Sequence, residues 1–338
     1  MFHFSTRNAL LPSAAMTILL GLRACGGGGG SDAPADTTTT TTASGAAAGA
    51  AAGTVTTTTT PPPTTPPPAA GPLSITGLTD YRSTAPNTLV NFAAATPNTV
   101  VSKAITGLNR AGFADEDIVV GIDVRPSNGV MNAFARAKDT NGDPLGAASI
   151  YVVNPDTGAA SGRVAVTGVV FDGATSVSVD FNPVADLLRV ITFFGQSVAI
   201  NVTNGAATQN GAIQGTTFAA AVAYTNSAVS TTAPASTVLY RIDNQGAPDD
   251  LTTVTPATGA VAAVGSIGID LNEVQAFDIT GATNENALAA LRTTATGAHS
   301  LYRINLTTGA ATLFNATAAL SLIGGAAGVP LVDIAIRP

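Results

Sequence analysis

Acidic residues recur in this 338-residue chain at positions where their side chains could bind a cation. Each carboxylate stands inside a short run of β-branched and apolar residues, and the candidate residues are Asp123, Asp180, Asp278 and Asp333, with Asn182 and Asn226 nearby. Carboxylate and amide oxygens that converge on one point suit Ca²⁺, a hard cation that prefers oxygen ligands. The alternative is structural: each Asp caps a turn or accepts backbone and arginine hydrogen bonds, and recurs because its unit recurs.

Other kinds of catalytic site have too few residues in this sequence. His3 lies at the N-terminus, His299 is the sole histidine after it, and Cys25 is the only cysteine. A Ser-His-Asp triad, a histidine metal site and thiol catalysis within the folded part are therefore not expected. The sequence leans towards a non-enzymatic protein, and Ca²⁺ is the one cofactor that its residue types suggest.

Further charged residues lie close to these positions. Arg125, Arg189 and Arg337 follow the Asp segments, and we expect them to pair with the carboxylates, with anion binding as the alternative. The run Asp139–Asp143 begins like a Ca²⁺-binding loop, but Asn-Gly at the tip of a hairpin explains the same residues. The acidic run Asp115–Asp117 is predicted to be a solvated loop.

The carboxylates belong to a repeated element, and this repeat decides the fold. The segments that hold them are Val119–Pro126, Val177–Pro183, Ala276–Ile279 and Leu331–Pro338. Three of these end at a proline, which marks the end of a strand because proline cannot donate to a ladder. Tyr224 stands at the Asp position of a similar segment. Positions 123, 180, 224, 278 and 333 are then 57, 44, 54 and 55 residues apart.

A second strand-like element, which contains tyrosine in three units, follows these openings at Ile150–Asn154, Val198–Asn201, Leu239–Asp243 and Leu301–Asn305. A Thr-Gly or Asn-Gly turn comes next, at once in three units and after an insertion in the Leu239 unit. A period near 50 residues with about four short strands is typical of a β-propeller. We predict an all-β propeller with five blades. Six blades, a solenoid and a β-sandwich are the alternatives.

The two ends of the repeat region have complementary defects. Leu331–Pro338 resembles the opening strand of a unit, yet the chain stops after it. The segment Leu73–Ile105 has strand-like runs but lacks an opening Asp strand. We predict that the two segments complete one blade, because pairing of the N- and C-terminal strands closes the ring and removes its open edges.

With these residues in view, residues 74–338 resemble the bacterial family called domain of unknown function 4394. The matching segments are Val179–Pro183, followed by Asp186 and Arg189–Val190, then Ala223–Ser227, the Leu-Tyr-x-Ile segments and Phe277–Ile279. The resemblance implies a repeated β fold and an extracytoplasmic setting. It implies no particular activity.

The N-terminal part reads as an export signal and a tether. Residues 1–25 hold an apolar run of about 14 residues, too short to span a bilayer, that ends at Cys25 in a lipobox-like sequence. We predict that Cys25 carries lipid, with ordinary secretion as the alternative. Residues 26–72 are rich in Gly, Thr, Ala and Pro and are predicted to be a disordered linker, with the folded domain at 73–338. A neutral low-complexity insertion is the other interpretation of this linker.

Charge and composition limit the partners of the domain. The net charge is −7 with only two lysines, Lys103 and Lys138, so no basic cluster exists and nucleic acid is not expected as a partner. We expect a monomer in the outer membrane, in the periplasm or on the cell surface, held at the membrane by its lipid. The leading hypothesis is a module that binds or presents a protein or small ligand. The alternative is a Ca²⁺-dependent, lactonase-like hydrolase acting in the central channel.

Overall fold

The computed structural model describes residues 73–83, 85–108, 117–214, 219–244, 249–272, 276–281, 286–293 and 298–337. The chain divides into two units, Met1–Thr65 and Pro66–Pro338, and all of the described residues belong to the second. The signal peptide predicted for residues 1–25, its Cys25 and the linker over residues 26–72 lie outside the described residues and stay predictions. No helix of the described part is long and apolar enough to cross a membrane.

Within the described residues, twenty strands form five antiparallel sheets of four strands each. One sheet contains β4 (Ile118–Arg125), β5 (Val130–Lys138), β6 (Pro144–Val153) and β7 (Ala160–Ala165). The next contains β8 (Val177–Asn182), β9 (Leu187–Thr192), β10 (Ser197–Ile200) and β11 (Ala207–Gln209). A third contains β12 (Ala219–Tyr224), β13 (Leu239–Asp243), β14 (Asp250–Thr255) and β15 (Ala260–Ser266). A fourth contains β16 (Ala276–Thr280), β17 (Asn286–Leu291), β18 (Ser300–Ile304) and β19 (Ala311–Leu313).

The fifth sheet joins the two ends of the domain, as the sequence predicts. Its order is β20 (Leu331–Arg337), β1 (Ser74–Thr79), β2 (Thr88–Ala93) and β3 (Val101–Ala104). β20 pairs antiparallel with β1, with Ile336 opposite Ile75 and Ile334 opposite Gly77. The short helices α1 (Ala318–Ser321) and η1 (Gly325–Ala327) lie in the connection that leads to β20.

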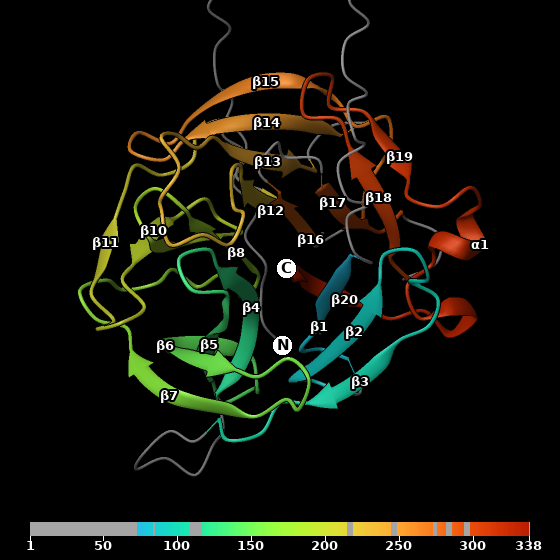
Figure 1. The fold of residues 1–338 in the computed structure, drawn as a ribbon. Helices are drawn as coiled ribbons and strands as arrows, with labels where there is room; N and C mark the ends of the chain where they lie inside the picture. The colour runs from blue at the N-terminus through green and yellow to red at the C-terminus, as the bar shows by residue number, and fades with distance from the viewer. Residues whose placement is uncertain are drawn as a thin grey trace, which may run out of the picture. The chain divides into compact units, whose positions relative to one another are not determined.

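The five sheets stand around a common axis as the blades of a β-propeller (Figure 1). The first strand of each blade is innermost, and each inner strand contacts the next in the order β4, β8, β12, β16, β20 and back to β4. The prediction of a five-bladed propeller is therefore confirmed, and the alternative of six blades is wrong.

The core is divided among the interfaces between blades. Each of the five interfaces holds one cluster of buried apolar side chains. β4 shows how the sequence achieves this, because successive side chains of a strand point to opposite faces. Its Val119 and Ile122 pack towards the closing blade, whereas Ile118 and Val120 pack towards the β8 blade. A register shift between Val119 and Gly121 inserts one extra residue and reverses the alternation, so Ile122 faces the same side of the sheet as Val119.

One strand assignment from the sequence is wrong. The segment Leu239–Asp243 resembles the tyrosine-containing third strand of other blades, but here it forms β13, the second strand. The third strand is β14, which lies in what the sequence suggests is an insertion and has no tyrosine. The real insertion precedes β13, where residues 225–238 connect it to β12.

Candidate functional site

The recurring carboxylates line the innermost strands and join neighbouring blades. The N–H of Phe181 on β8 donates to Asp123 Oδ2 on β4 over 2.6 Å. In the same way Asp180 accepts from the N–H of Tyr224 at 3.1 Å. All four carboxylates are at most 7% exposed. Each therefore satisfies a backbone donor of the blade that follows, where an unpaired buried N–H would cost free energy.

The same bond recurs towards the end of the ring. Asp278 on β16 accepts from the N–H of Ile336 on β20 at 2.6 Å. Asp333 on β20 accepts from the N–H of Ile122 on β4 at 2.9 Å, which joins the last inner strand to the first. We call Asp123, Asp180, Asp278 and Asp333 the carboxylate ring.

Tyr224 takes the place of an Asp on β12, and so the ring has no carboxylate at this position. Its side chain is 1% exposed, and its hydroxyl accepts from Arg189 Nε at 3.3 Å. The tyrosine therefore binds back towards the β8 blade rather than forward to β16. This substitution breaks the symmetry of the ring at one junction.

Three members of the ring approach one another closely. Asp123, Asp180 and Asp278 each offer one carboxylate oxygen, and these oxygens lie within 4.8 Å of one another. Three carboxylates at this spacing are a ligand set that a hard cation such as Ca²⁺ could use. Asp333 is not part of this group of three.

Burial dominates the electrostatics of the ring. It raises the pKa of Asp278 to about 6, against the pull of backbone N–H donors that favour the charged form. Burial also raises the pKa of Asp123 and of Asp180 well above 3.8, and repulsion from neighbouring ring carboxylates adds to it. Asp333 is shifted in the same direction for the same reasons. The ring therefore holds protons more tightly than carboxyl groups in water.

Small hollows adjoin the inner strands at two places. A cavity of about 10 Å³ borders Asp123 and Asp278, and Ser227 and Val229 of the 225–238 loop cover it. A second cavity of about 10 Å³ lies against Val120 on β4, beneath Tyr81. Each has room for about one water-sized sphere. Next to the ring, the described residues therefore leave space for a water molecule or a single ion.

The two candidate amides do not join the ring. Asn182 Oδ1 accepts from the N–H groups of Val184 and Ala185, both at 2.9 Å, in the turn after β8. Asn226 lies in the 225–238 loop with a positive φ of 61°, and its Nδ2 donates to the carbonyl of Ser236 at 2.8 Å. Both side chains therefore organise turns at the ends of inner strands.

The arginines also have partners other than those expected. Arg125 pairs with Asp186, and Arg337 donates to Asp156 at 2.7 Å. Arg189 donates to Asn210 Oδ1 at 2.6 Å. The expected pairing of these arginines with the carboxylate ring is therefore wrong, because backbone N–H groups already occupy the ring oxygens.

The two acidic segments, Asp139–Asp143 and the one that ends at Asp117, differ in how their carboxylates are bonded. Asp139 Oδ1 accepts from the N–H groups of Asn141 and Asp143, both at 2.8 Å, so the carboxylate is directed into its own hairpin, as the hairpin interpretation predicts. Asp117 is 1% exposed and accepts from the hydroxyl of Tyr151 at 2.9 Å. The prediction of a solvated loop is therefore wrong for Asp117, while residues 115 and 116 lie outside the described part.

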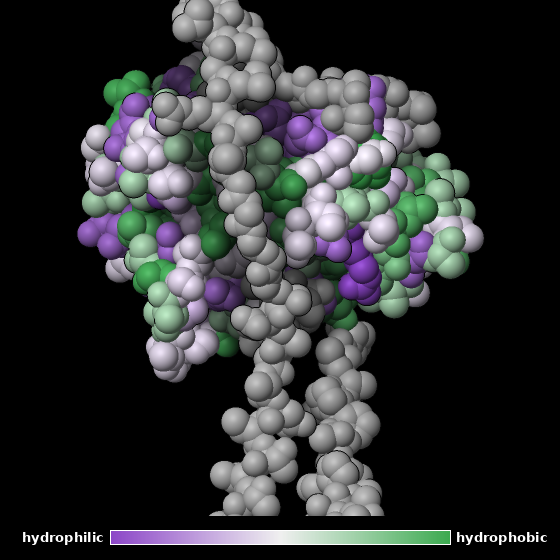
Figure 2. Space-filling model, turned by 90° about the horizontal axis from the view of Figure 1, so that it is seen from above, coloured by the Kyte–Doolittle hydropathy of each residue, from purple (hydrophilic) through white to green (hydrophobic). Residues whose placement is uncertain are grey.

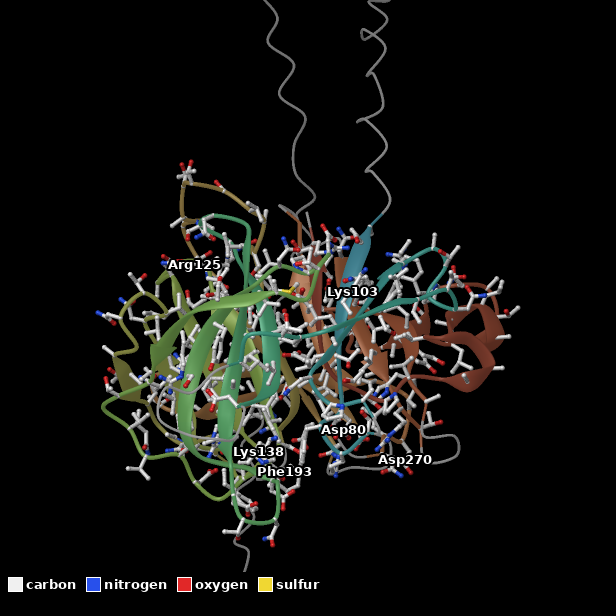
Figure 3. The ribbon with its side chains drawn as sticks, turned by 90° about the horizontal axis from the view of Figure 1, so that it is seen from below. Asp80, Lys103, Arg125, Lys138, Phe193 and Asp270 are labelled. Carbon is white, nitrogen blue, oxygen red and sulfur yellow. The ribbon has the colours of Figure 1, made fainter. Side chains whose placement is uncertain are left out.

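Sequence reasoning did not bring together a second group of polar residues, which consists of Arg125, Ser127 and Asp186. Figure 3 shows Arg125 at one end of the strands, and Asp80, Lys138, Phe193 and Asp270 at the opposite end. We call the end that holds Arg125 the Arg125 face. Here Asp186 accepts from Arg125 Nε at 2.8 Å and from the hydroxyl of Ser127 at 2.9 Å. The length of the 225–238 loop, visible as the gap between Tyr224 and Leu239, is the signal that could have drawn attention to this face.

Comparison with known families and structures gives one informative match. The model of a family described as Domain of unknown function (DUF4394) matches residues 88–327, which include three of the four ring carboxylates. No curated protein matches the chain significantly.

Several solved structures are similar to the chain at low sequence identity. TolB from Acinetobacter baumannii is similar over 79% of this chain and 67% of its own, with 11% identity and a TM-score of 0.43. A chain of a nidogen/laminin complex is similar over 79% of this chain and 99% of its own, with 8% identity and a TM-score of 0.41. A protein from Lactobacillus plantarum is similar over 75% of this chain and 69% of its own, with 16% identity and a TM-score of 0.35. None of these bears on function.

Proposed function

The chain belongs to the DUF4394 family, whose function is unknown, and we propose that it is an exported, lipid-anchored propeller that binds or presents a protein or small ligand. The observation that carries the binding role is the use of the carboxylate ring. Each ring carboxylate accepts a backbone N–H of the next inner strand. Carboxylates that accept backbone hydrogen bonds at equivalent positions stabilise the junctions between blades. We therefore assign ligand binding to the loops, which carry binding residues in many folds.

The competing function is a Ca²⁺-dependent hydrolase that acts in the central channel. The close approach of Asp123, Asp180 and Asp278 favours a cation at the ring. A substrate would also need room beside that cation, and the cavity that borders Asp123 and Asp278 measures about 10 Å³. Pockets for drug-sized ligands measure roughly 300–1,000 Å³. The described residues therefore suit a bound ion better than a bound substrate.

A calcium experiment separates the two functions. The purified chain is analysed for metal, melted with and without Ca²⁺, and assayed on a simple lactone and an aryl ester. For a binding module, we expect the same melting temperature with and without Ca²⁺ and no turnover. One Ca²⁺ per chain, together with turnover and a Ca²⁺-dependent rise in melting temperature that Asp278→Asn removes, would overturn the binding role. Asp250→Asn is the matched control, because Asp250 is exposed at the start of β14 and belongs to neither candidate calcium site.

The export part of the proposal rests on the sequence around Cys25. An apolar run of about 14 residues precedes this single cysteine. A lipid on Cys25 would hold the domain at a membrane by way of residues 26–72. Metabolic labelling with a fatty acid should mark the wild-type chain and leave Cys25→Ser unlabelled. Equal labelling of both chains would contradict the anchor and leave the binding role untouched.

A further inference from the structure

The Arg125 face has one connection that differs from its counterparts. Residues 126–129 join β4 to β5 and residues 183–186 join β8 to β9, whereas residues 225–238 join β12 to β13. In repeat proteins, insertions into single units gather on one face, which is often the binding face. The 225–238 loop therefore marks the Arg125 face as the place to look for a ligand.

The 225–238 loop is fixed to other blades rather than free at its tip. The N–H of Ser230 donates to the carbonyl of Pro126, in the β4–β5 turn, at 2.9 Å. The hydroxyl of Thr280, on β16, donates to the carbonyl of Ser227 at 3.4 Å. The loop thus crosses from its own blade to the β4 blade and holds a defined position there.

A cavity of about 90 Å³ lies between this loop and the turns of the β4 and β8 blades. Its walls combine apolar groups with hydroxyl and carboxylate groups, including Pro126, Val184 and Ala233 on the one hand and Ser127, Thr231 and Asp186 on the other. Val184 and Val229 are 43% and 42% exposed on this side of the molecule. Small apolar surface and polar groups therefore meet at one opening.

The polar wall is held in place before any ligand arrives. Asp186 has a positive φ of 54° and is bound by both Arg125 and Ser127. Asn226, where the long loop begins, also has a positive φ. Asp and Asn adopt this conformation more readily than other non-glycine residues, and Gly129 adopts it at the same place in the β4–β5 turn. Arg125 also neutralises the Asp186 carboxylate, so the wall offers hydrogen-bond acceptors without a net charge.

The size of the cavity selects the class of ligand. A volume of about 90 Å³ is below the ~150 Å³ that accepts benzene and well below the ~300–1,000 Å³ of sites for drug-sized molecules. It suits one small aliphatic side chain. The hydroxyl and carboxylate acceptors beside it suit the N–H groups of a peptide main chain. The net charge of −7 favours a neutral or basic partner over an acidic one.

We propose that the cavity beneath the 225–238 loop is a docking site for a neutral or basic segment of extended polypeptide that inserts one small aliphatic side chain. This inference rests on the proposed binding role and names its surface and partner class. On the side of the domain seen in Figure 2, hydrophobic and hydrophilic residues are interspersed at short range. The cavity is distinguished from such surface by its walls and its fixed polar groups.

Peptides of one design test the proposal on the purified full-length chain. The probes are blocked, fluorescently labelled pentapeptides of sequence Lys-Gly-X-Gly-Lys, in which X is Gly, Val or Phe, and a Val peptide flanked by Glu. Anisotropy titrations should show the Val peptide binding about tenfold more tightly than the Gly peptide, because one aliphatic side chain is buried. The Phe peptide should gain nothing over Gly, and the Glu-flanked peptide should bind more weakly than its Lys counterpart.

Variants of the cavity decide whether the binding occurs there. Ala233→Leu fills the opening and should abolish the preference for Val, whereas Ala319→Leu, on the exposed helix α1, should keep it. If Ala233→Leu lowers the melting temperature, Val184→Thr replaces it, since this change keeps the volume and removes an apolar wall. Equal binding of Gly and Val peptides, or no binding of any peptide, would overturn the inference. A Val preference that survives both cavity variants would move the site elsewhere and leave the proposed binding role intact.

Discussion

The centre and the rim of the propeller join the same blades by different physical means. At the centre, buried carboxylates accept backbone N–H groups of the next blade. At the rim, one Thr-Gly or Asn-Gly turn in each of four blades packs against a backbone carbonyl in or just after the outer strand of the preceding blade. The four contacts at the rim join Gly158 to Ala104, Gly205 to Ala165, Gly259 to Ala212 and Gly309 to Gly265.

The two kinds of junction should respond to different changes. Contacts at the centre are polar and depend on the protonation of four buried carboxyl groups. Contacts at the rim are steric, because a Cβ at Gly205 would lie 2.0 Å from the carbonyl oxygen of Ala165. The centre should therefore tolerate a neutral side chain of the same shape and respond to pH. The stability of the rim contacts should not change with pH, and these contacts should tolerate no added methyl group.

The largest effect should come from removing a whole inner strand. Deletion of residues 331–338 leaves the rim contacts in place and opens the centre at β20. Leu331, Ile334 and Ile336 are at most 3% exposed, and each contributes about 1.5–3 kcal/mol by its burial. Their sum is comparable with the whole stability of a domain, about 5–15 kcal/mol. We expect unfolding or aggregation, measured by circular dichroism and gel filtration.

The same deletion tests whether the contacts at the rim are enough to keep the propeller folded. The matched control removes only residues 337 and 338, which leaves Ile336 and its bond to Asp278 in place. A monomeric 331–338 deletion with an unchanged melting temperature would show that the inner strand is dispensable. It would also mean that contacts at the rim contribute more to the stability of the folded domain than contacts at the centre.

The next effect in size tests the rim with a single methyl group. Gly205 has φ 75°, so Gly205→Ala combines left-handed strain with a clash against Ala165. Gly268→Ala is the control, since Gly268 has φ 74° and nothing lies within 4 Å of its added Cβ. Strain alone costs about 1–2 kcal/mol. We expect about that loss in the control and at least twice as much for Gly205→Ala, from urea unfolding midpoints. Equal losses would mean that the rim contact contributes nothing beyond strain.

The sequence predicts the fold because the repeat exposes it. A strand with Asp at a fixed place marks four blades, a glycine turn later in the unit marks the β12 blade and three of the same blades, and the complementary ends predict the closing blade correctly. The error in the β12 blade has a physical cause: Leu239–Asp243 has the composition of a buried strand, and such a pattern cannot distinguish the second strand of a blade from the third.

The candidate site is predicted only in part. The recurrence of Asp identifies the ring, and backbone hydrogen bonds are among the alternatives that the sequence allows, but no residue pattern reveals that the N–H donors belong to the next blade. Asn182 ends β8 and Asn226 follows β12, and the side chains of both bind within turns rather than at the ring. The cavity on the Arg125 face depends on three loops from different blades. Its parts are ordinary Pro, Ser and Thr residues, and only the length of the 225–238 loop signals it.

The next smaller effect is the change of stability with pH, which we expect from the carboxyl groups at the centre and not from the glycine contacts at the rim. The pKa of Asp278 is about 6 in the folded protein, against 3.8 as its ordinary value, so the folded state binds more protons between these limits. Stability is then fully present below pH 4 and falls as the pH rises through about 6. For this one carboxyl group the loss is about 2–3 kcal/mol.

Urea midpoints at pH 4 and pH 7.5 measure this loss. The pKa values of Asp123, Asp180 and Asp333 are raised as well, so their contributions have the same sign. Asp278→Asn should flatten the slope, whereas Gly268→Ala, a change near the rim, should leave it unchanged. A midpoint that rises from pH 4 to pH 7.5 would show that another set of groups controls the pH dependence.

The smallest expected effect tests whether the centre needs an acceptor or a charge. Asp180 has a single inter-blade bond, which its Oδ1 accepts from the N–H of Tyr224, and it is 2% exposed. Asp180→Asn keeps an oxygen acceptor of the same shape and removes both the burial of a charge, which is the main cause of the raised pKa of Asp180, and the repulsion from Asp123 and Asp278 that adds to it. At pH 7.5 the variant should be as stable as the wild type or slightly more stable.

Asp180→Leu has a similar volume but no acceptor, so the N–H of Tyr224 is left unsatisfied in a buried place. Such a group costs about 1–3 kcal/mol. The difference between the Asn and Leu variants in urea unfolding therefore measures the bond itself, separately from the charge. If both variants lose the same amount, the charge of Asp180 matters more than its acceptor. That outcome would favour a cation bound at the centre. The blades would then be joined by a bound ion at the centre and by steric contacts at the rim.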